Sequence, residues 1–194
     1  MPLFKRCLEL SHALELQAWL PGIASVLGYT YALVERLADA VPLLEQALQG
    51  VNSARLMFFR HYAAFWLSEA ALLSGRLADA RALAEPALAL SRQRQEQGHE
   101  AWVLRLLGDI AMHRDSLDIE QAQTHYQQAL ALAEELGMRP LQAHCHRALG
   151  TLYRQTGQSD QARAALSTAI EMYRDMAMTF WLPETQAVLA VVAG

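Results

Sequence analysis

The sequence contains one lysine and one asparagine, Lys5 and Asn52, and two cysteines, Cys7 and Cys145. Two cysteines so far apart do not predict a disulfide framework, and they favour the reducing cytoplasm as the location. A chain with a single lysine has little means of forming a phosphate-binding loop of the G-x-x-x-x-G-K-[ST] type, and none is present. No apolar run approaches the roughly 18 residues of a membrane span, and no apolar signal-peptide segment follows Met1.

The sequence also lacks a strong excess of charge of either sign. The 194 residues carry 16 basic and 20 acidic side chains, for a formal net charge of −4. A charge so close to balance gives no general electrostatic attraction to nucleic acid or to an anionic membrane. We therefore expect neither as a partner.

A repeat of 40 to 42 residues is the strongest pattern present. Its first marker is a Leu followed by a small residue, with steps of 40, 40 and 42 between successive copies: Leu27-Gly28, Leu67-Ser68, Leu107-Gly108 and Leu149-Gly150. Two further markers keep the same register: Ala40, Ala80, Ala122 and Ala162, then Ala47-Leu48, Ala87-Leu88, Ala129-Leu130 and Ala169-Ile170. A fixed period of this size predicts stacked supersecondary units.

Each unit is predicted to be a helical hairpin, because apolar residues recur at i, i+3, i+4 and i+7 and no alternating strand pattern occurs. Gly and Pro are expected at the edges of helices: Pro21, Pro140 and Pro183 at starts, and Gly98 and Gly137 at ends. The small residues Gly28, Ser68, Gly108 and Gly150 (the small positions) are expected to let the second helix of each hairpin approach closely. That second helix carries an apolar residue at the matching place: Leu44, Ala84, Tyr126 and Leu166 (the facing positions).

The order Leu-Gly-x-x-Tyr, then Ala, then an apolar residue, then Ala-Leu resembles the tetratricopeptide repeat (TPR). The resemblance covers nearly the whole chain and implies an all-α fold, a right-handed α-solenoid of antiparallel helical hairpins. The period exceeds the usual 34 or so residues, so longer helices are expected. Repeats of this length are similar to those in the helical arms of bacterial regulators of the LuxR/maltose-regulator type, or of proteins with ATPase or cyclase domains.

One TPR-like domain is predicted over 1–194. It comprises a half-repeat at 2–16, repeats at about 19–52, 53–98, 99–137 and 139–178, and a terminal helix at 181–193. Trp19-Leu20-Pro21 recurs as Trp181-Leu182-Pro183, so both ends are half-repeats. Because the terminal helix is apolar where a solenoid end is normally polar, a homodimer through the terminal half-repeats is one expectation.

Two motifs imitate catalytic or metal chemistry. His113-Arg114-Asp115 has the letters of a kinase triplet, but the following Asn and a Gly-rich loop are missing. His144-Cys145-His146 looks like a metal site. Neighbours two apart on a helix do not share a face, so one His is expected to be packed and the other in solvent. We expect no enzyme activity, no metal and no cofactor.

In TPR arrays the first helices line the concave groove. Carried over position by position, the resemblance implies a partner-binding set with aromatic residues in its first half and mostly charged residues in its second: Tyr29, Tyr62, Phe65, Glu69, Trp102, Arg105, Asp109, His144, Arg147 and Arg154. Such a groove suits a peptide with apolar anchors at one end and acidic groups at the other. The alternative is that the arginines pair inside the array with Glu69, Asp109 or Glu184 and that the aromatics are core. The carboxylate clamp of chaperone TPR proteins is not expected, since it needs groove asparagines and the single Asn is Asn52.

Three functions remain open from the sequence. The leading one is a non-catalytic protein–protein interaction or scaffold module, in a bacterial signalling or regulatory system, that binds another protein or a peptide. The second is a small-ligand or peptide sensor of a transcription regulator, and the third is a self-association module.

Overall fold

The computed structural model describes residues 2–16, 18–53, 57–113 and 117–193. Within these ranges the chain is helical and has no strand, as predicted. The helices are α1 Pro2–Ala13, α2 Leu20–Leu33, α3 Leu37–Ser53, α4 Met57–Leu73, α5 Leu77–Gln93, α6 Gln97–Ala111, α7 Ile119–Glu135, α8 Arg139–Gln155, α9 Ser159–Asp175, the 3₁₀ turn η1 Thr179–Trp181 and α10 Leu182–Ala193. None of the described helices is both long and apolar enough to cross a membrane. Most of the motif His113-Arg114-Asp115 lies outside the described residues.

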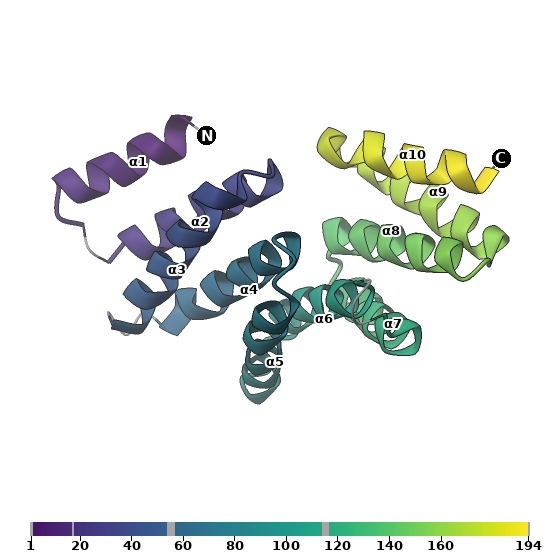
Figure 1. Cartoon of the computed structure of the whole chain (residues 1–194), viewed down its shortest axis with the longest axis horizontal. Coiled ribbons are helices and arrows are strands. Elements are labelled where there is room, and N and C mark those ends of the chain that lie inside the picture. The colour runs from purple at the N-terminus through teal and green to yellow at the C-terminus, as the bar shows by residue number, and fades with distance from the viewer. Residues whose placement is uncertain (1, 17, 54–56, 114–116, 194) are drawn as a thin grey trace. The chain divides into compact units, whose positions relative to one another are not determined.

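The chain divides into two compact units, Met1–Leu90 and Ser91–Gly194. In the first unit, α1 packs on α2, α2 and α3 form a hairpin, and α4 packs on both α2 and α3 (Figure 1). The core of this hairpin is built from repeat-marker residues, among them Leu27, Ala40 and Leu44. The repeat therefore specifies the packing of the first unit directly.

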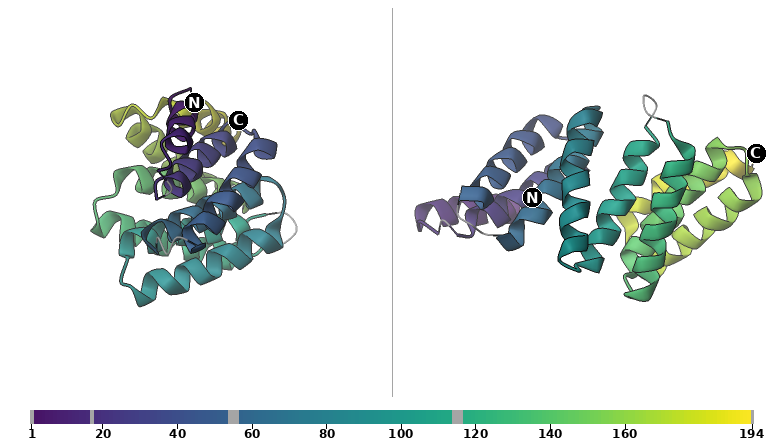
Figure 2. Two further views of the ribbon diagram at one scale, coloured as in Figure 1. Left: turned by 90° about the vertical axis from the view of Figure 1, so that its left-hand side faces the viewer. Right: turned by 90° about the horizontal axis from the view of Figure 1, so that it is seen from below.

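The second unit repeats this arrangement from α6 onward. The pairs α6–α7 and α8–α9 form hairpins, α7 packs on α8, and α10 packs on α9 (Figure 2). Tyr126, Leu149 and Leu152 lie in one core cluster, and Ala143, Ala169 and Tyr173 lie in another. The first helices α6, α8 and α10 of this unit carry most of the side chains considered below.

The small positions make the close contacts that the sequence predicts. A Cβ added at Gly150 would lie 2.6 Å from Leu166 Cγ, and one added at Gly28 would lie 2.7 Å from Leu44 Cγ. Gly108 meets the ring of Tyr126 in the same way. No larger residue fits at these three positions unless its neighbour moves.

Ser68 shows how the contact changes when the small residue has a side chain. Its Oγ donates a hydrogen bond of 2.7 Å to the carbonyl oxygen of Ala80, and Ser68 is fully buried. The residue at the facing position of this hairpin is Ala84, the smallest of the four. The small and facing positions are therefore complementary in size: glycine lies opposite a large residue, Leu or Tyr, and serine lies opposite the smaller Ala.

Two expectations about glycine and proline were wrong. Gly98 does not end a helix: α5 stops at Gln93, Gln95 takes the left-handed conformation with φ of 57°, and Gly98 lies in the first turn of α6. Pro42 and Pro86 lie inside α3 and α5. Both prolines and the residues four before them are exposed, at positions where water can hydrate a carbonyl that has lost its helical donor.

Candidate functional site

The second unit brings its predicted groove residues together on α6 and α8. Arg105 is buried, with 5% of its surface exposed, and its Nη1 donates to Asp109 Oδ2. The hydroxyl of Tyr126 donates to the other carboxylate oxygen of Asp109 at 2.8 Å. The positive charge of Arg105 is therefore neutralised inside the unit, as the alternative interpretation of the sequence stated.

His144 lies at the centre of a ring cluster. Its Nδ1 shares a hydrogen bond of 2.8 Å with the hydroxyl of Tyr173, and its ring centroid lies 4.9 Å from Trp181 and 5.8 Å from Trp102. Burial, helped by the positive charges of Arg105 and Arg147, lowers the pKa of His144 to about 3. The imidazole is therefore neutral at physiological pH and serves as a packed, hydrogen-bonded ring.

Arg147 is more accessible than the other arginine of this cluster, Arg105. Its Nη1 lies 2.9 Å from Glu184 Oε2, and its guanidinium lies 5.4 Å from the ring centroid of Trp181. The side chain of Arg147 is 24% exposed and that of Glu184 is 66% exposed. Nε of Arg147 is buried without a hydrogen-bond partner among the described residues. The guanidinium of Arg147 therefore lies over the Trp181 ring and is held on one side by the carboxylate of Glu184.

Arg154 lies about two turns past Arg147 on α8 and is exposed. His146, next to Cys145, is half-buried, and burial lowers its pKa. His144 is the packed member of the pair, in line with the sequence interpretation, although His146 is not fully in solvent. Among the described residues, no group of three or more His, Cys, Asp or Glu side chains could hold a metal ion.

In the first unit the predicted aromatic residues are arranged around Trp66. Tyr29 stacks on Trp66 with ring centroids 5.4 Å apart, and Tyr62 lies 5.7 Å from the same ring. Tyr62 is exposed, whereas Phe65 is only 5% exposed and Glu69 is half-buried. Phe65 is therefore part of the core in this structure.

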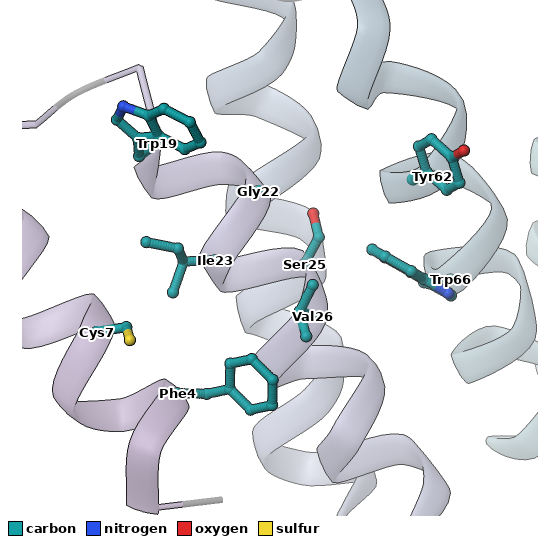
Figure 3. Close-up of a pocket in the computed structure, with 9 residues that line it drawn as sticks. All are labelled: Phe4, Cys7, Trp19, Gly22, Ile23, Ser25, Val26, Tyr62 and Trp66. Carbon is teal, nitrogen blue, oxygen red and sulfur yellow. The ribbon is translucent and has the colours of Figure 1, made fainter.

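A cavity of about 410 Å³ opens beside these rings. Figure 3 shows α1, α2 and α4 around it, with Phe4 and Cys7 from α1 facing Ile23 and Val26 on α2. Its lining carries no charged side chain: Phe4, Cys7, Trp19, Gly22, Ile23, Ser25, Val26, Tyr62 and Trp66.

The sequence interpretation missed Trp66 and Trp181, the two rings around which the clusters form. A signal for Trp181 was present, because it repeats Trp19 at the entry to a first helix. Trp66 directly follows the predicted groove residue Phe65 and was given no role from the sequence. Its position beside Tyr29 depends on how α4 packs on α2, which the sequence does not state.

Paired hairpins, matched small positions and an aromatic face on the first helices define a helical repeat domain of the TPR-like class. The model of the MalT-like TPR region matches residues 22–193. The chain belongs to that family.

Solved structures support the same fold. A signal transduction ATPase of the STAND type with a tetratricopeptide repeat sensor, from Pyrococcus horikoshii, is 21% identical with a TM-score of 0.70. BtubC (BKLC) from P. vanneervenii is 20% identical with a TM-score of 0.74, and the apo form of RapI is 16% identical with a TM-score of 0.66. The matches cover 97–98% of this chain, but only 30%, 80% and 53% of the three relatives in that order. No curated protein sequence matches the chain.

Proposed function

We propose that the chain is a non-catalytic interaction module of a bacterial signalling or regulatory system, and that it binds a peptide segment of another protein. The proposed contact face is formed by Trp102, Arg147, Trp181 and Glu184 of the second unit. Arg154, also on α8, extends it, and Tyr29 and Tyr62 are proposed contacts in the first unit. A near-balanced charge makes a protein a better partner than nucleic acid or a membrane.

The arrangement around Arg147 carries the proposal. A guanidinium stacked on Trp181 combines an apolar platform with a charge that binds carboxylates bidentately. Its present partner, Glu184, is mostly exposed, so an acidic side chain of a peptide can take that place at small cost. Arg105 and His144 are buried and act by holding the neighbouring rings, so we do not assign them direct contact.

Selection from a random peptide library tests the proposal. We expect the enriched peptides to carry an acidic residue near an aromatic or aliphatic one. Arg147→Met should weaken their binding about tenfold or more, since a charge-assisted hydrogen bond contributes roughly 1.5–3 kcal/mol. Glu184→Gln should strengthen binding, because it removes the competing carboxylate.

Arg139→Met is the matched control. Arg139 lies on the same helix, exposed, in an ion pair with Asp175 at 3.3 Å and outside the face. Failure to enrich any peptide, or equal losses in the Arg147 and Arg139 variants, would contradict the proposal.

Ligand sensing is the second candidate, favoured by the sensor role named for the tetratricopeptide repeat of the Pyrococcus horikoshii relative. A thermal-shift screen of metabolites separates the two. A compound that raises the melting temperature of the wild type but not of Arg147→Met would favour the sensor and leave the peptide face without support.

A further inference from the structure

Two arginines on the face of the second unit have matching surroundings. Arg105 on α6 and Arg147 on α8 are 42 residues apart, the same step that separates the Leu markers of these two helices. The guanidinium of Arg105 lies 5.6 Å from the ring centroid of Trp102. That of Arg147 lies 5.4 Å from the ring centroid of Trp181. Both tryptophan rings pack against the imidazole of His144, so the face holds two Arg–Trp pairs that share one imidazole.

The two arginines differ in how their acidic partners are held. Arg105 pairs with Asp109 on its own helix, and the two side chains are 7% and 26% exposed. The hydroxyl of Tyr126, from α7, donates to the second oxygen of the same carboxylate. Arg147 pairs with Glu184 from α10, whose side chain is mostly exposed. We call Arg105–Asp109 the closed pair and Arg147–Glu184 the open pair.

The closed pair is costly to separate. Its carboxylate accepts hydrogen bonds from two helices and its guanidinium is buried, so withdrawal of Asp109 would leave an uncompensated buried charge. Burial and the charge of Asp109 raise the pKa of Tyr126 well above its usual value, which keeps the hydroxyl a donor throughout the physiological range. In the open pair Glu184 can turn into water at small cost, because it is exposed. A ligand therefore has one guanidinium to bind, that of Arg147.

Charge on this face is balanced before a ligand arrives, since the two arginines are matched by two carboxylates. Burial, together with the charges of both arginines, lowers the pKa of His144 to about 3, so the imidazole is neutral and both charges act on the same place. A ligand with one negative charge can replace Glu184 against Arg147. A phosphate group carries about −1.5 to −2 charges near pH 7, so it needs a second cation that the closed pair does not release.

We propose that the face around Arg147 selects a single carboxylate over a phosphate group, and that Asp109 is the residue that determines this selectivity. Asp109 acts without touching the ligand, because it keeps the charge of Arg105 neutralised. The carboxylate belongs either to an acidic side chain or to the end of a chain, and the aromatic rings favour an apolar group beside it. This inference rests on the proposed function, since it concerns the same face, but its test needs no selected peptide.

Three small probes that share one aromatic side chain test the selectivity. N-acetyl-glutamyl-phenylalanine amide carries a side-chain carboxylate, N-acetyl-phenylalanine carries a chain-end carboxylate, and N-acetyl-phosphoseryl-phenylalanine amide carries a phosphate. Binding is followed by NMR through the signal of the buried Nε–H of Arg147, which is assigned by its loss in Arg147→Met. At about pH 7 we expect the phosphate probe to bind the wild type at least about threefold more weakly than the better carboxylate probe. The better of the two carboxylate probes identifies the source of the carboxylate.

Asp109→Asn tests the residue itself. The change leaves an acceptor for Tyr126 but removes the negative charge, so Arg105 becomes a second available cation. We expect the phosphate probe to gain at least about fivefold in affinity relative to the carboxylate probe. Arg105→Met added to Asp109→Asn removes that cation and should return the ratio to its wild-type value. Asp175→Asn is the matched control, since Asp175 is exposed, pairs with Arg139 at 3.3 Å and lies outside the face.

Tyr126→Phe is a milder second variant. It weakens the hold on Asp109 without removing a charge, so it should move the ratio in the same direction, by about twofold.

Three results would overturn the proposal. One is a phosphate probe that binds the wild type as tightly as the better carboxylate probe. Another is a ratio that stays unchanged in whichever of the Asp109 and Tyr126 variants folds, or that changes equally in Asp175→Asn. The third is an Arg147 signal that none of the three probes shifts.

These outcomes are distinct from those that decide the proposed function. Selective carboxylate binding without any enriched library peptide would support the selectivity and contradict the interaction role. Enriched peptides together with equal binding of phosphate and carboxylate would support the interaction role and contradict the selectivity.

Discussion

The hydroxyl of Tyr173 lies 2.8 Å from Nδ1 of His144, and both residues are buried. This contact joins α9 to α8 and holds the ring against which Trp102 and Trp181 pack. A buried imidazole in such a place makes the stability of the second unit depend on pH.

Stability should fall as the pH drops below about 6.5. The pKa of His144 is about 3 in the folded chain and near 6.5 when unfolded, so the unfolded state binds more protons between these values. The contribution of neutral His144 to the free energy of unfolding is complete above pH 6.5. It is lost on acidification, by up to about 1.4 kcal/mol per pH unit. His146, whose pKa is also lowered, acts in the same direction. Urea unfolding of the wild type and His144→Gln between pH 5 and 7 should show a shallower slope for the variant, and identical slopes would contradict this.

Gly150→Leu should destabilise the chain by about 1–3 kcal/mol, because the new side chain overlaps Leu166. Adding Leu166→Ala should recover part of the loss and reproduce the size match of Ser68 with Ala84. Gly98→Ala is the control, since its Cβ would meet only the side chain of Met138, no closer than 3.6 Å. The measurement is the free energy of unfolding, and two losses that simply add would contradict the size match.

Ala177→Gly should stabilise the chain by about 1 kcal/mol. Ala177 follows α9 with φ of 54°, a conformation that costs a residue with a Cβ roughly 1–2 kcal/mol and glycine little. Gly157, with φ of 75° after α8, is the converse test, and Gly157→Ala should destabilise. Thermal melts of both variants check the signs.

The two cysteines should differ in reactivity. Cys7 is exposed, whereas burial raises the pKa of the Cys145 thiol to about 12. One equivalent of a thiol reagent should react with the native chain and two with the unfolded chain. If Cys7→Ser no longer shows the fast-reacting thiol, that thiol is Cys7. Fast reaction of Cys145 in the native chain would contradict the prediction and show that α8 opens readily.

The Arg147–Glu184 pair should contribute little to stability. Glu184 is 66% exposed, and exposed ion pairs contribute about 0.2–1 kcal/mol. A double-mutant cycle with Arg147→Met and Glu184→Gln should give a coupling energy below about 1 kcal/mol that decreases further in salt. A larger coupling would mean that the contact is too strong for a peptide to displace.

The repeat made the hairpins predictable, because a small residue and an apolar partner at fixed offsets have one way to pack. Arg105 and Asp109 were also within reach of sequence reasoning, since i and i+4 share a helix face. The contact of Arg147 with Glu184 was foreseen only as one alternative among several, because it depends on how α10 packs beside α8. Trp66 was missed for the same reason. Contacts within a helix follow from spacing, whereas contacts between helices need the register of the packed hairpins.

The matched sizes at the small and facing positions have a consequence for folding. Chains of similar repeats risk pairing a first helix with the second helix of a different repeat. Here such an exchange is penalised: Tyr126 opposite Ser68 would overlap a side chain, and Ala84 opposite Gly108 would leave a void. The volumes of two residues therefore distinguish the α4–α5 and α6–α7 hairpins from each other and from the other two, whereas α2–α3 and α8–α9 share the pair Gly opposite Leu.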